Sequence, residues 1–544
     1  MKAVCEERRR DMKRIISFLL CLAVFAGILS SCNSAEPVVL FFAVEKSAGS
    51  FDPQIVSDAT ASIVVRNCFE GLLRRDENGD VVNGVAESWS VSKDGLKYTF
   101  KLREDAVWHL TSNAKEQLGE RLPENFDLSV TAYDFQFALR RAVAPETGAH
   151  LSYMLYNIEN APEILDGRKT PEELGVRVID KYTLEITLSQ PQSNFSEVLT
   201  EPVCMPCNET FFKGCTGRYG TLIAFSLSNG PFYLSRFDEV SYRINKAADY
   251  CGEAVAVPDY VWLYVVDSEE RLLEVLETDD YSGGILNADA YEKLKITKKM
   301  TVTETANTVK GFIMNLSDPV MGEENIRKAL LSATDTGAVA ENMNKEQAKG
   351  IIPPVVEKTA VSHPVAYSEE KAQVYLKNGL SKLETAKIDI SVLCERKDEE
   401  TVRRLMQEWQ RILGISVNFS VKTAEADKLS QAVETGNYQV ALCNLRCETD
   451  EAYEYFGSFT SGSPRNVTKF DGFGMEELIG KLYASDEKSF LSVYSSIESK
   501  LYSASLIIPV CNENTYFVCT QNVRDVIYFS GNDKLYFHKA TNVK

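Results

Sequence analysis

Histidine and tryptophan are scarce in this chain of 544 residues, which has four of each. The histidines, at positions 109, 150, 363 and 538, form neither an HxH nor an HxxxH pair, so they do not predict a metal site. Basic residues are also few, with 59 Lys and Arg against 78 Asp and Glu. Because a nucleic-acid-binding protein needs a basic patch to meet phosphates, this balance argues against a nucleic-acid partner.

Sequence signatures of common enzyme classes are absent as well. The chain contains no GxSxG, no HExxH and no phosphate-binding GxxxxGK[ST] segment. Acidic pairs such as Glu323–Glu324 lie on helix faces that we expect to be solvated. The sequence does not bring together the set of groups that a catalytic site needs. We therefore predict a protein that is not an enzyme and uses no cofactor.

Cysteine is not scarce, since the chain has thirteen. The closest pair is Cys204 and Cys207, in a CxxC arrangement that occurs in zinc half-sites and redox pairs. No second CxxC follows, and the flanking Pro202 and Pro206 do not suit the start of a redox helix. We therefore predict no metal site, and expect packed thiols or one or two disulfides.

Long apolar runs are missing except at the N-terminus. Basic residues at 8–14 precede an apolar run at 15–29, which Ser30, Ser31 and Cys32 follow. This order is typical of an export signal, and the run is short for a bilayer-spanning helix, which needs about 20 residues. Leu-Ser-Ser-Cys at the end of the run resembles a bacterial lipobox, which implies a diacylglycerol on Cys32.

These features predict a signal peptide at 1–31, a tether at 32–37 and a soluble remainder held to the membrane by lipid chains alone. The alternative is an uncleaved transmembrane helix. The mature protein is expected on the outer face of the plasma membrane, or in the periplasm if the host has two membranes. Met12 opens a more typical signal than Met1, so both start codons stay open.

Hydrophobic periodicity predicts strands and helices along the rest of the chain. The stretch 388–442 alternates strand, helix, strand, helix and strand, as in a parallel or mixed sheet with covering helices. Its first helix, at 398–413, ends before a glycine. Elsewhere we expect helices at 59–73 and 368–379 and a short strand at 312–315. No polar linker divides the chain, which indicates that it crosses between lobes more than once.

Two hairpins and a capped helix are also predicted. The hairpins, at 89–102 and 176–188, turn at an Asp-Gly and an Asp-Lys pair. The helix begins after Thr131, with Asp134 three residues on as its acidic capping partner.

Short segments along 38–540 match, in order, those of one protein family. The blocks are FDP at 51–53, FEGLL at 69–73, GVAESW at 84–89, DGLKYTFKLR at 94–103, VTAYDF at 130–135, NGPF at 229–232, NIRKAL at 325–330 and LGISV at 413–417. Together they resemble the family 5 extracellular solute-binding proteins, which include the oligopeptide- and dipeptide-binding receptors of ABC importers. The segment 174–188 resembles the oligopeptide branch in particular.

The resemblance implies an α/β fold of the bilobal periplasmic-binding-protein type, with two hinge crossings and an extra inserted domain. Lobe I would comprise 38–70, 200–290 and 500–544, the inserted domain 71–199, and lobe II 291–499. It also implies a monomer that captures an oligopeptide by closing about the hinge and then docks to the permease subunits of an ABC transporter. Dipeptide, nickel or haem ligands, or a role as a peptide sensor, are the alternatives.

In the oligopeptide branch, the segment after a strand of lobe II supplies backbone partners and an acidic residue for the α-amino group of the peptide. The matching segment here is 438–451. It places Glu448 at the acid, Leu445 at an aromatic residue and Asn444 at a glycine. A slip of one or two residues would nominate Asp450 instead of Glu448.

Three further residues are ligand-binding candidates from the resemblance. Arg446 would pair with the nearby acid or with a ligand carboxylate. Ser57 and Asp58 match the segment of lobe I that pairs with the peptide backbone, although they would serve equally well as a helix cap. The loop at 109–129 is longer than in the family, and is either part of the pocket wall or a surface excursion.

Overall fold

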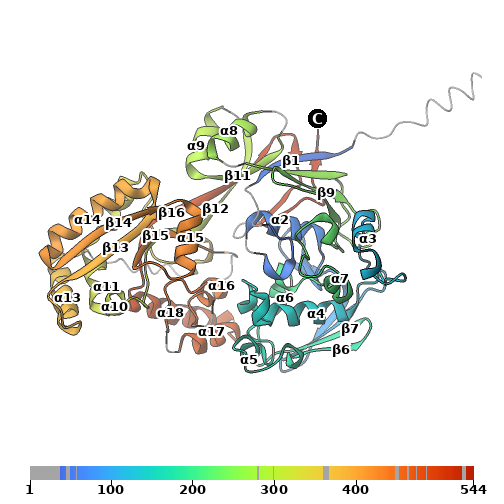
Figure 1. Cartoon of the computed structure of the whole chain (residues 1–544), viewed down its shortest axis with the longest axis horizontal. Helices are drawn as coiled ribbons and strands as arrows, with labels where there is room; N and C mark the ends of the chain where they lie inside the picture. The colour runs from blue at the N-terminus through green and yellow to red at the C-terminus, as the bar shows by residue number, and fades with distance from the viewer. Residues whose placement is uncertain are drawn as a thin grey trace, which may run out of the picture. The chain divides into compact units, whose positions relative to one another are not determined.

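The computed structural model describes residues 37–44, 49–56, 58–266, 268–278, 281–297, 299–358, 367–447, 452–461, 463, 465–472, 474–485, 487–529 and 534–543. All described helices and strands belong to one compact unit, Val39–Lys544 (Figure 1). The predicted signal peptide at 1–31 and the predicted anchor Cys32 lie outside the described residues. Within the described ranges, no helix has the length and apolar character needed to cross a membrane.

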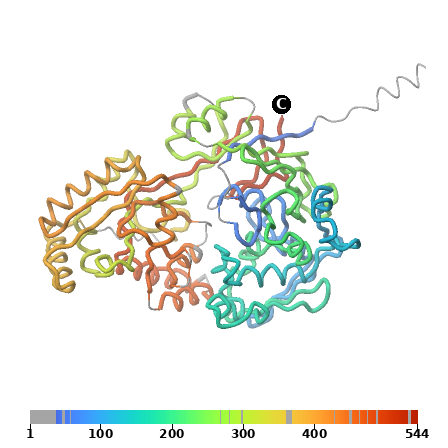
Figure 2. Tube along the Cα trace, in the orientation of Figure 1, coloured from blue at the N-terminus to red at the C-terminus, as the bar shows by residue number. Residues whose placement is uncertain are grey.

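A mixed sheet of ten strands organises this unit. In sheet order the strands are β14 (Val417–Ala424), β13 (Ile388–Glu395), β15 (Val440–Arg446), β12 (Met300–Met314), β16 (Ile507–Thr520), β11 (Gly283–Asn287), β1 (Val39–Val44), β10 (Tyr260–Val265), β9 (Ser241–Lys246) and β8 (Phe232–Phe237). β13 is parallel to both of its neighbours, and so is β1, whereas β12 and β16 are antiparallel. Figure 2 shows β16, near the C-terminus, running beside β12 from the middle of the chain.

The central pair of β12 and β16 joins two halves of the sheet. On one side of the pair the strands come from 388–446, and on the other side they come from 39–44 and 232–287. Because β12 and β16 have 15 and 14 residues, each is long enough to take part in both halves. This is the bilobal α/β architecture with two crossings that the resemblance implies.

The predicted alternation at 388–442 is confirmed. α14 (Glu399–Leu413) and α15 (Ala426–Glu434) connect β13, β14 and β15, and both helices pack against these strands. The inner side of α14 buries Trp409, which contacts Phe312 of β12 edge to face. The helix ends at Gly414, whose φ of 75° is one that residues with a side chain rarely adopt.

A second, antiparallel sheet of four strands comes from the range predicted for the inserted domain. In sheet order its strands are β4 (Ala86–Val91), β5 (Lys97–Leu102), β7 (Thr183–Thr187) and β6 (Val176–Asp180). Both predicted hairpins are present, and β5 pairs with β7. α4 (Ala132–Val143) packs against β6 and β7, and its predicted cap is confirmed, because the Thr131 N–H donates to the Asp134 carboxylate at 2.7 Å.

The remaining elements are mostly short. The helices are α3 (Ser112–Leu118), α5 (Ala161–Leu165), α6 (Phe195–Val198), α7 (Glu209–Gly214), α8 (Glu269–Glu277), α9 (Ala288–Thr297), α10 (Pro319–Gly322), α11 (Glu324–Ser332), α12 (Thr336–Asn342), α16 (Ala452–Gly457), α17 (Met475–Tyr483) and α18 (Glu487–Ala504). The strands β17 (Val523–Arg524) and β20 (Thr541–Asn542) form one pair, and β18 (Ile527–Phe529) and β19 (Lys534–Tyr536) form another.

The helix predicted at 59–73 is shorter than expected. α2 spans Ala59–Cys68, and Leu73–Arg75 is instead strand β2, paired with β3 (Val81–Asn83). The Asn229 side chain explains the difference, because it accepts from the Glu70 N–H at 3.1 Å and donates to the Glu70 carbonyl at 2.9 Å. These two bonds satisfy the Glu70 backbone outside a helix.

Two other predicted elements have different bounds. The strand predicted at 312–315 is only the end of β12, whose first part is rich in Thr and carries no apolar run. The helix predicted at 368–379 continues as α13 (Glu369–Lys382). Gly379 does not end it but lets it pack closely on Ile326, whose Cδ1 would be 2.5 Å from a Cβ at position 379.

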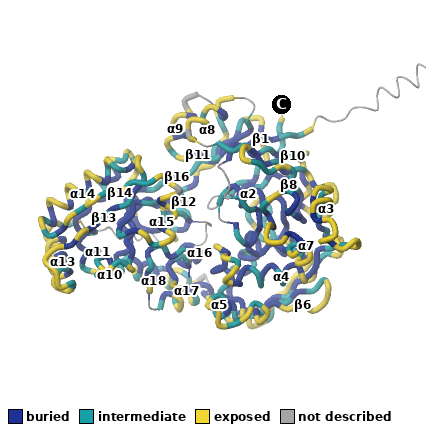
Figure 3. Tube along the Cα trace, viewed as in Figure 1, coloured by how far each residue is buried: buried dark blue, intermediate teal, exposed yellow. Residues whose placement is uncertain are grey.

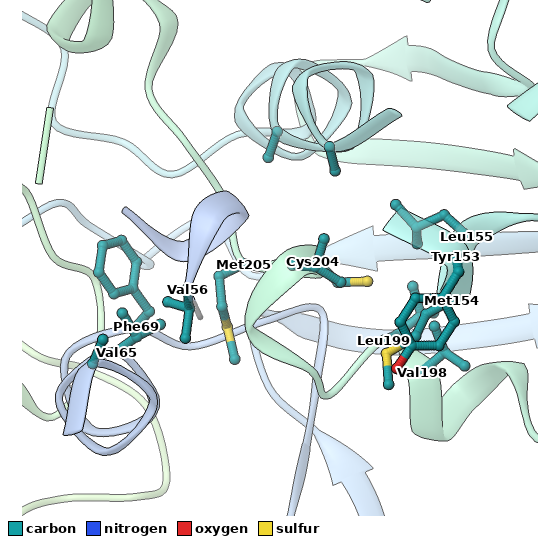
Figure 4. Close-up of a cluster of buried hydrophobic side chains, with 14 of the residues drawn as sticks. Val56, Val65, Phe69, Tyr153, Met154, Leu155, Val198, Leu199, Cys204 and Met205 are labelled. Atoms are coloured by element: carbon teal, nitrogen blue, oxygen red, sulfur yellow. The ribbon is translucent and has the colours of Figure 1, made fainter. Parts of the chain in front are cut away.

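Buried residues follow the strands, and exposed residues lie on the outer sides of helices such as α13 and α14 (Figure 3). Figure 4 shows part of the core, where Cys204 and Met205 lie among side chains of α2 and of 153–155 and 198–199. All ten cysteines in the described ranges are free thiols, and most are buried. Packed thiols are therefore confirmed over the disulfide alternative, and burial raises the pKa of Cys207 to about 12.

Candidate functional site

The structure brings three of the predicted ligand-binding residues together at the carboxyl end of β15. Asn444, Leu445 and Arg446 pair with Lys310, Val309 and Thr308 of β12 in an antiparallel register. Asn444 is exposed, and its two neighbours are half-buried. Glu448 and Asp450 follow this strand but lie outside the described residues. The carboxyl end of β15 therefore lies beside β12, one of the two strands that join the halves of the sheet. The residues that follow it in sequence, 448–451, are called the candidate loop.

The chain is held firmly just before the candidate loop. The Cys447 N–H donates to the Asn307 carbonyl of β12 at 2.9 Å. The Arg465 guanidinium donates to the Arg446 carbonyl at 3.2 Å and to the Tyr153 hydroxyl at 3.1 Å. Arg465 thus connects the base of the loop to the range predicted for the inserted domain. Sequence reasoning missed it because no motif marks it.

The candidates from lobe I remain untested. Ser57 lies outside the described residues. Asp58 is the N-cap of α2, where its Oδ1 accepts from the Ala61 N–H at 2.8 Å. The helix cap that the sequence left open is therefore present, and a ligand contact by Asp58 stays a prediction.

The pair of β12 and β16 is irregular in the part of β12 that lies next to the carboxyl end of β15. Its register shifts between Thr305 and Thr308 of β12, and again between Lys310 and the next residue. Four buried polar atoms on the two strands have no hydrogen-bond partner among the described residues: Thr305 Oγ1, Asn307 Nδ2, Asn514 Oδ1 and Thr515 Oγ1. An unpaired buried polar group costs about 1–3 kcal/mol, and these atoms lie where the register of the two strands shifts.

A buried ion pair fixes β12 to the chain before α14. Lys310 Nζ lies 2.8 Å from Asp398 Oδ2, and the two side chains are 5% and 7% exposed. Because an isolated buried charge is costly, the pair constrains the position of β12 rather than adding much net stability. No local sequence pattern predicts this ion pair, since its partners are far apart along the chain.

A second buried network lies near α2. The Glu201 carboxylate is 2.5 Å from Arg66 Nη2 and 2.7 Å from Lys534 Nζ, and all three side chains are almost fully buried. Burial alone would raise the pKa of Glu201, but the two cations lower it to about 2. The network therefore ties α2, η6 (Pro202–Cys204) and β19 together through one ionised carboxylate.

The long loop at 109–129 forms a surface helix. It contains α3, which packs against η7 (Ile223–Phe225). At its start, the His109 ring stacks on Tyr233 with 4.1 Å between centroids, and His109 Nδ1 lies 2.7 Å from Asp249. These contacts place the loop on the surface, and Thr111 near its start lines a small cavity, so its role in a pocket wall stays a prediction.

Comparisons with known proteins agree with this fold. The model for bacterial extracellular solute-binding proteins, family 5 middle, matches residues 80–466. A dipeptide-binding protein of Lactococcus lactis is 26% identical over 538 residues, which cover 91% of this chain and 93% of that protein. The periplasmic oligopeptide-binding protein OppA of Escherichia coli is 26% identical over 513 residues, which cover 90% of each chain.

Solved structures resemble the chain over nearly all of its length. Listeria monocytogenes OppA bound to peptide matches with a TM-score of 0.76 and 22% identity, over 94% of this chain and 100% of that one. The Escherichia coli murein tripeptide binding protein MppA matches with a TM-score of 0.78 and 21% identity, over 94% and 99%. At these identities the two structures establish the fold.

Proposed function

Because the chain belongs to the family 5 bacterial extracellular solute-binding proteins, we propose that it captures oligopeptides between two lobes and delivers them to the permease of an ABC importer. The family binds solutes and is not a family of enzymes. The proposed lobe I is 38–70, 200–290 and 500–544, the inserted domain 71–199 and lobe II 291–499. Closure about β12 and β16 would bury the peptide.

The observation that carries the proposal is the position of β15. Its carboxyl end, with the exposed Asn444, stands beside the polar, irregular part of β12 and β16. A receptor for peptides of varied sequence must bind the backbone and ignore the side chains. The backbone at a strand end supplies donors and acceptors for such a peptide, which favours a peptide over an apolar solute.

We assign the charged end of the peptide to the loop after β15. Glu448, or Asp450 in a shifted alignment, would bind the α-amino group, and Arg446 would orient that acid or bind a carboxylate. Ser57 and Asp58 would contact the backbone from lobe I. A dipeptide is the second candidate ligand, because one similar curated protein is a dipeptide-binding protein.

The acid assignment is tested by calorimetric titration with alanine peptides of two to six residues, each with a free and an acetylated N-terminus. We expect Glu448→Ala to weaken binding of the free peptides at least about tenfold and to leave the acetylated ones unchanged, since only the former carry the ammonium group. Glu434→Ala, at the exposed end of α15, is the matched control. Equal binding of the free peptides by wild type and Glu448→Ala would show that another residue binds the α-amino group.

The membrane anchor is proposed from the N-terminal sequence. A lipidated Cys32 would hold the mature chain at the outer face of the plasma membrane, or in the periplasm if the host has two membranes. Cys32→Ser expressed in a bacterial host should leave the membrane fraction and lose labelling by a fatty-acid analogue. A variant that stays in the membrane fraction would contradict the anchor.

A further inference from the structure

A cavity of about 380 Å³ lies between two parts of the chain that are far apart in sequence. Tyr153, Tyr156 and Gln190 line it from the range proposed as the inserted domain. Glu476 and Tyr483 of α17 line it from the range proposed as lobe II. An occupant of this cavity would therefore contact both parts at once.

The two walls touch directly beside the cavity. The Ser193 N–H donates to the Tyr483 carbonyl at 3.2 Å. Gly480 also lies at this contact, where a Cβ would be 2.9 Å from the Gln190 amide. The cavity thus lies beside a direct contact between the two parts of the chain.

The chemistry of the lining favours a cation. Three tyrosines and one carboxylate line the cavity, and none of the described lining residues is Lys, Arg or His. Glu476 Oε1 accepts from the N–H and the hydroxyl of Ser461 at 2.9 and 2.8 Å. Burial alone would raise the pKa of Glu476, but these bonds and the nearby Lys500 lower it, so the group is an anion at neutral pH.

The cavity is also linked to the candidate peptide loop. Tyr153 accepts a hydrogen bond from Arg465, which donates to the Arg446 carbonyl two residues before Glu448. The Arg465 guanidinium lies 5.9 Å from the Tyr153 ring, so this ring already contacts one cation. A group seated in the cavity would lie against a side chain that is bonded to the base of the loop.

We propose that this cavity is a subsite for one basic side chain of a bound peptide, a guanidinium or an ammonium group. Aromatic rings with a carboxylate attract such cations, and the attraction is stronger where water is displaced. The subsite rests on the proposed peptide-binding function and gives it a sequence preference. Because its walls come from two parts of the chain, an occupied subsite would also hold those parts together.

The test uses pairs of alanine hexapeptides that carry arginine or its uncharged isostere citrulline at each position in turn. Wild type should bind the arginine peptide about tenfold more tightly at one position at least. Glu476→Gln should reduce that ratio to nearly one without weakening the citrulline peptide. Glu477→Gln is the matched control, because Glu477 is the next residue of α17, pairs with Lys481 and does not line the cavity.

The outcomes separate this inference from the function on which it rests. Equal binding of arginine and citrulline peptides by wild type at every position would overturn the subsite and leave peptide binding in place. A preference that survives in Glu476→Gln would overturn the role of this cavity. If wild type binds none of the hexapeptides, the subsite fails; if it also binds none of the alanine peptides of two to five residues, the proposed function fails with it.

Discussion

At the scale of single residues, Glu201 shows how burial and charge fix the protonation of a group. Its pKa in the fold is about 2, below the ordinary value of 4.5, because Arg66 and Lys534 outweigh the cost of burial. A carboxyl group with a lowered pKa stabilises the fold above its unfolded pKa. That stability is lost as the pH falls from about 4.5 through about 2.

Glu201→Gln should therefore lower the free energy of unfolding at pH 7 by about 3–5 kcal/mol, since two buried cations would lose their counter-charge. The difference from wild type should shrink between about pH 4.5 and pH 2, as wild type becomes protonated. Denaturant unfolding of both proteins between pH 7 and pH 2 measures this difference and its change with pH. Glu477→Gln, in an exposed pair, should change stability by less than about 1 kcal/mol. A pH-independent difference would contradict the account of Glu201.

Some of the candidate site follows from the sequence at this scale, and some does not. Asn444, Leu445 and Arg446 are consecutive, so their placement on one strand end needs only the strand to be found. Arg465 and Tyr153 meet across 312 residues of chain, and no local pattern predicts such a contact. The role of Glu448 depends on an alignment, and this residue lies outside the described ranges.

At the scale of elements, Gly414 ends α14 with a φ of 75° and a ψ of −160°. Only glycine adopts this region readily, and other residues pay about 1–3 kcal/mol there. Gly414→Ala should therefore lower the free energy of unfolding by that amount, measured by denaturant melts, although open space surrounds the position. Ile415→Ala is the control. Because Ile415 is 82% exposed, its replacement should change the free energy of unfolding by less than about 0.5 kcal/mol. Equal free energies of unfolding for wild type and Gly414→Ala would show that an alanine is not strained at this position.

A helix or strand is predictable from sequence where the spacing of its apolar residues and the residue that ends it point to the same element. α14 has both a regular apolar side and a terminal glycine, and its bounds were found to within a residue. β12 was mostly missed, because Thr, Glu and Asn occupy its first part and its hydrogen bonds come from strands far along the chain. The predicted end of α13 at Gly379 is wrong, because this glycine allows close packing against Ile326 and does not end the helix.

At the scale of the whole molecule, the topology is predictable from the family resemblance and not from hydrophobic periodicity. The order of the ten strands places β1 between β11 and β10 and pairs β12 with β16, and in all three pairings the partner residues are more than 180 residues apart. Local patterns carry no information on such pairings. Eight ordered blocks did carry it, because a family shares its topology. The boundaries of the lobes and of the inserted domain remain predictions.

Native mass spectrometry of purified 33–544 shows whether the molecule closes on a peptide. A receptor that buries its cargo should retain it through a gentle purification, so the account predicts bound masses that fragment as peptides of two or more residues. Glu448→Ala should retain less of them. Wild type that carries no peptide, and whose melting temperature does not change with a mixed peptide pool, would contradict closure on a peptide and leave only the fold.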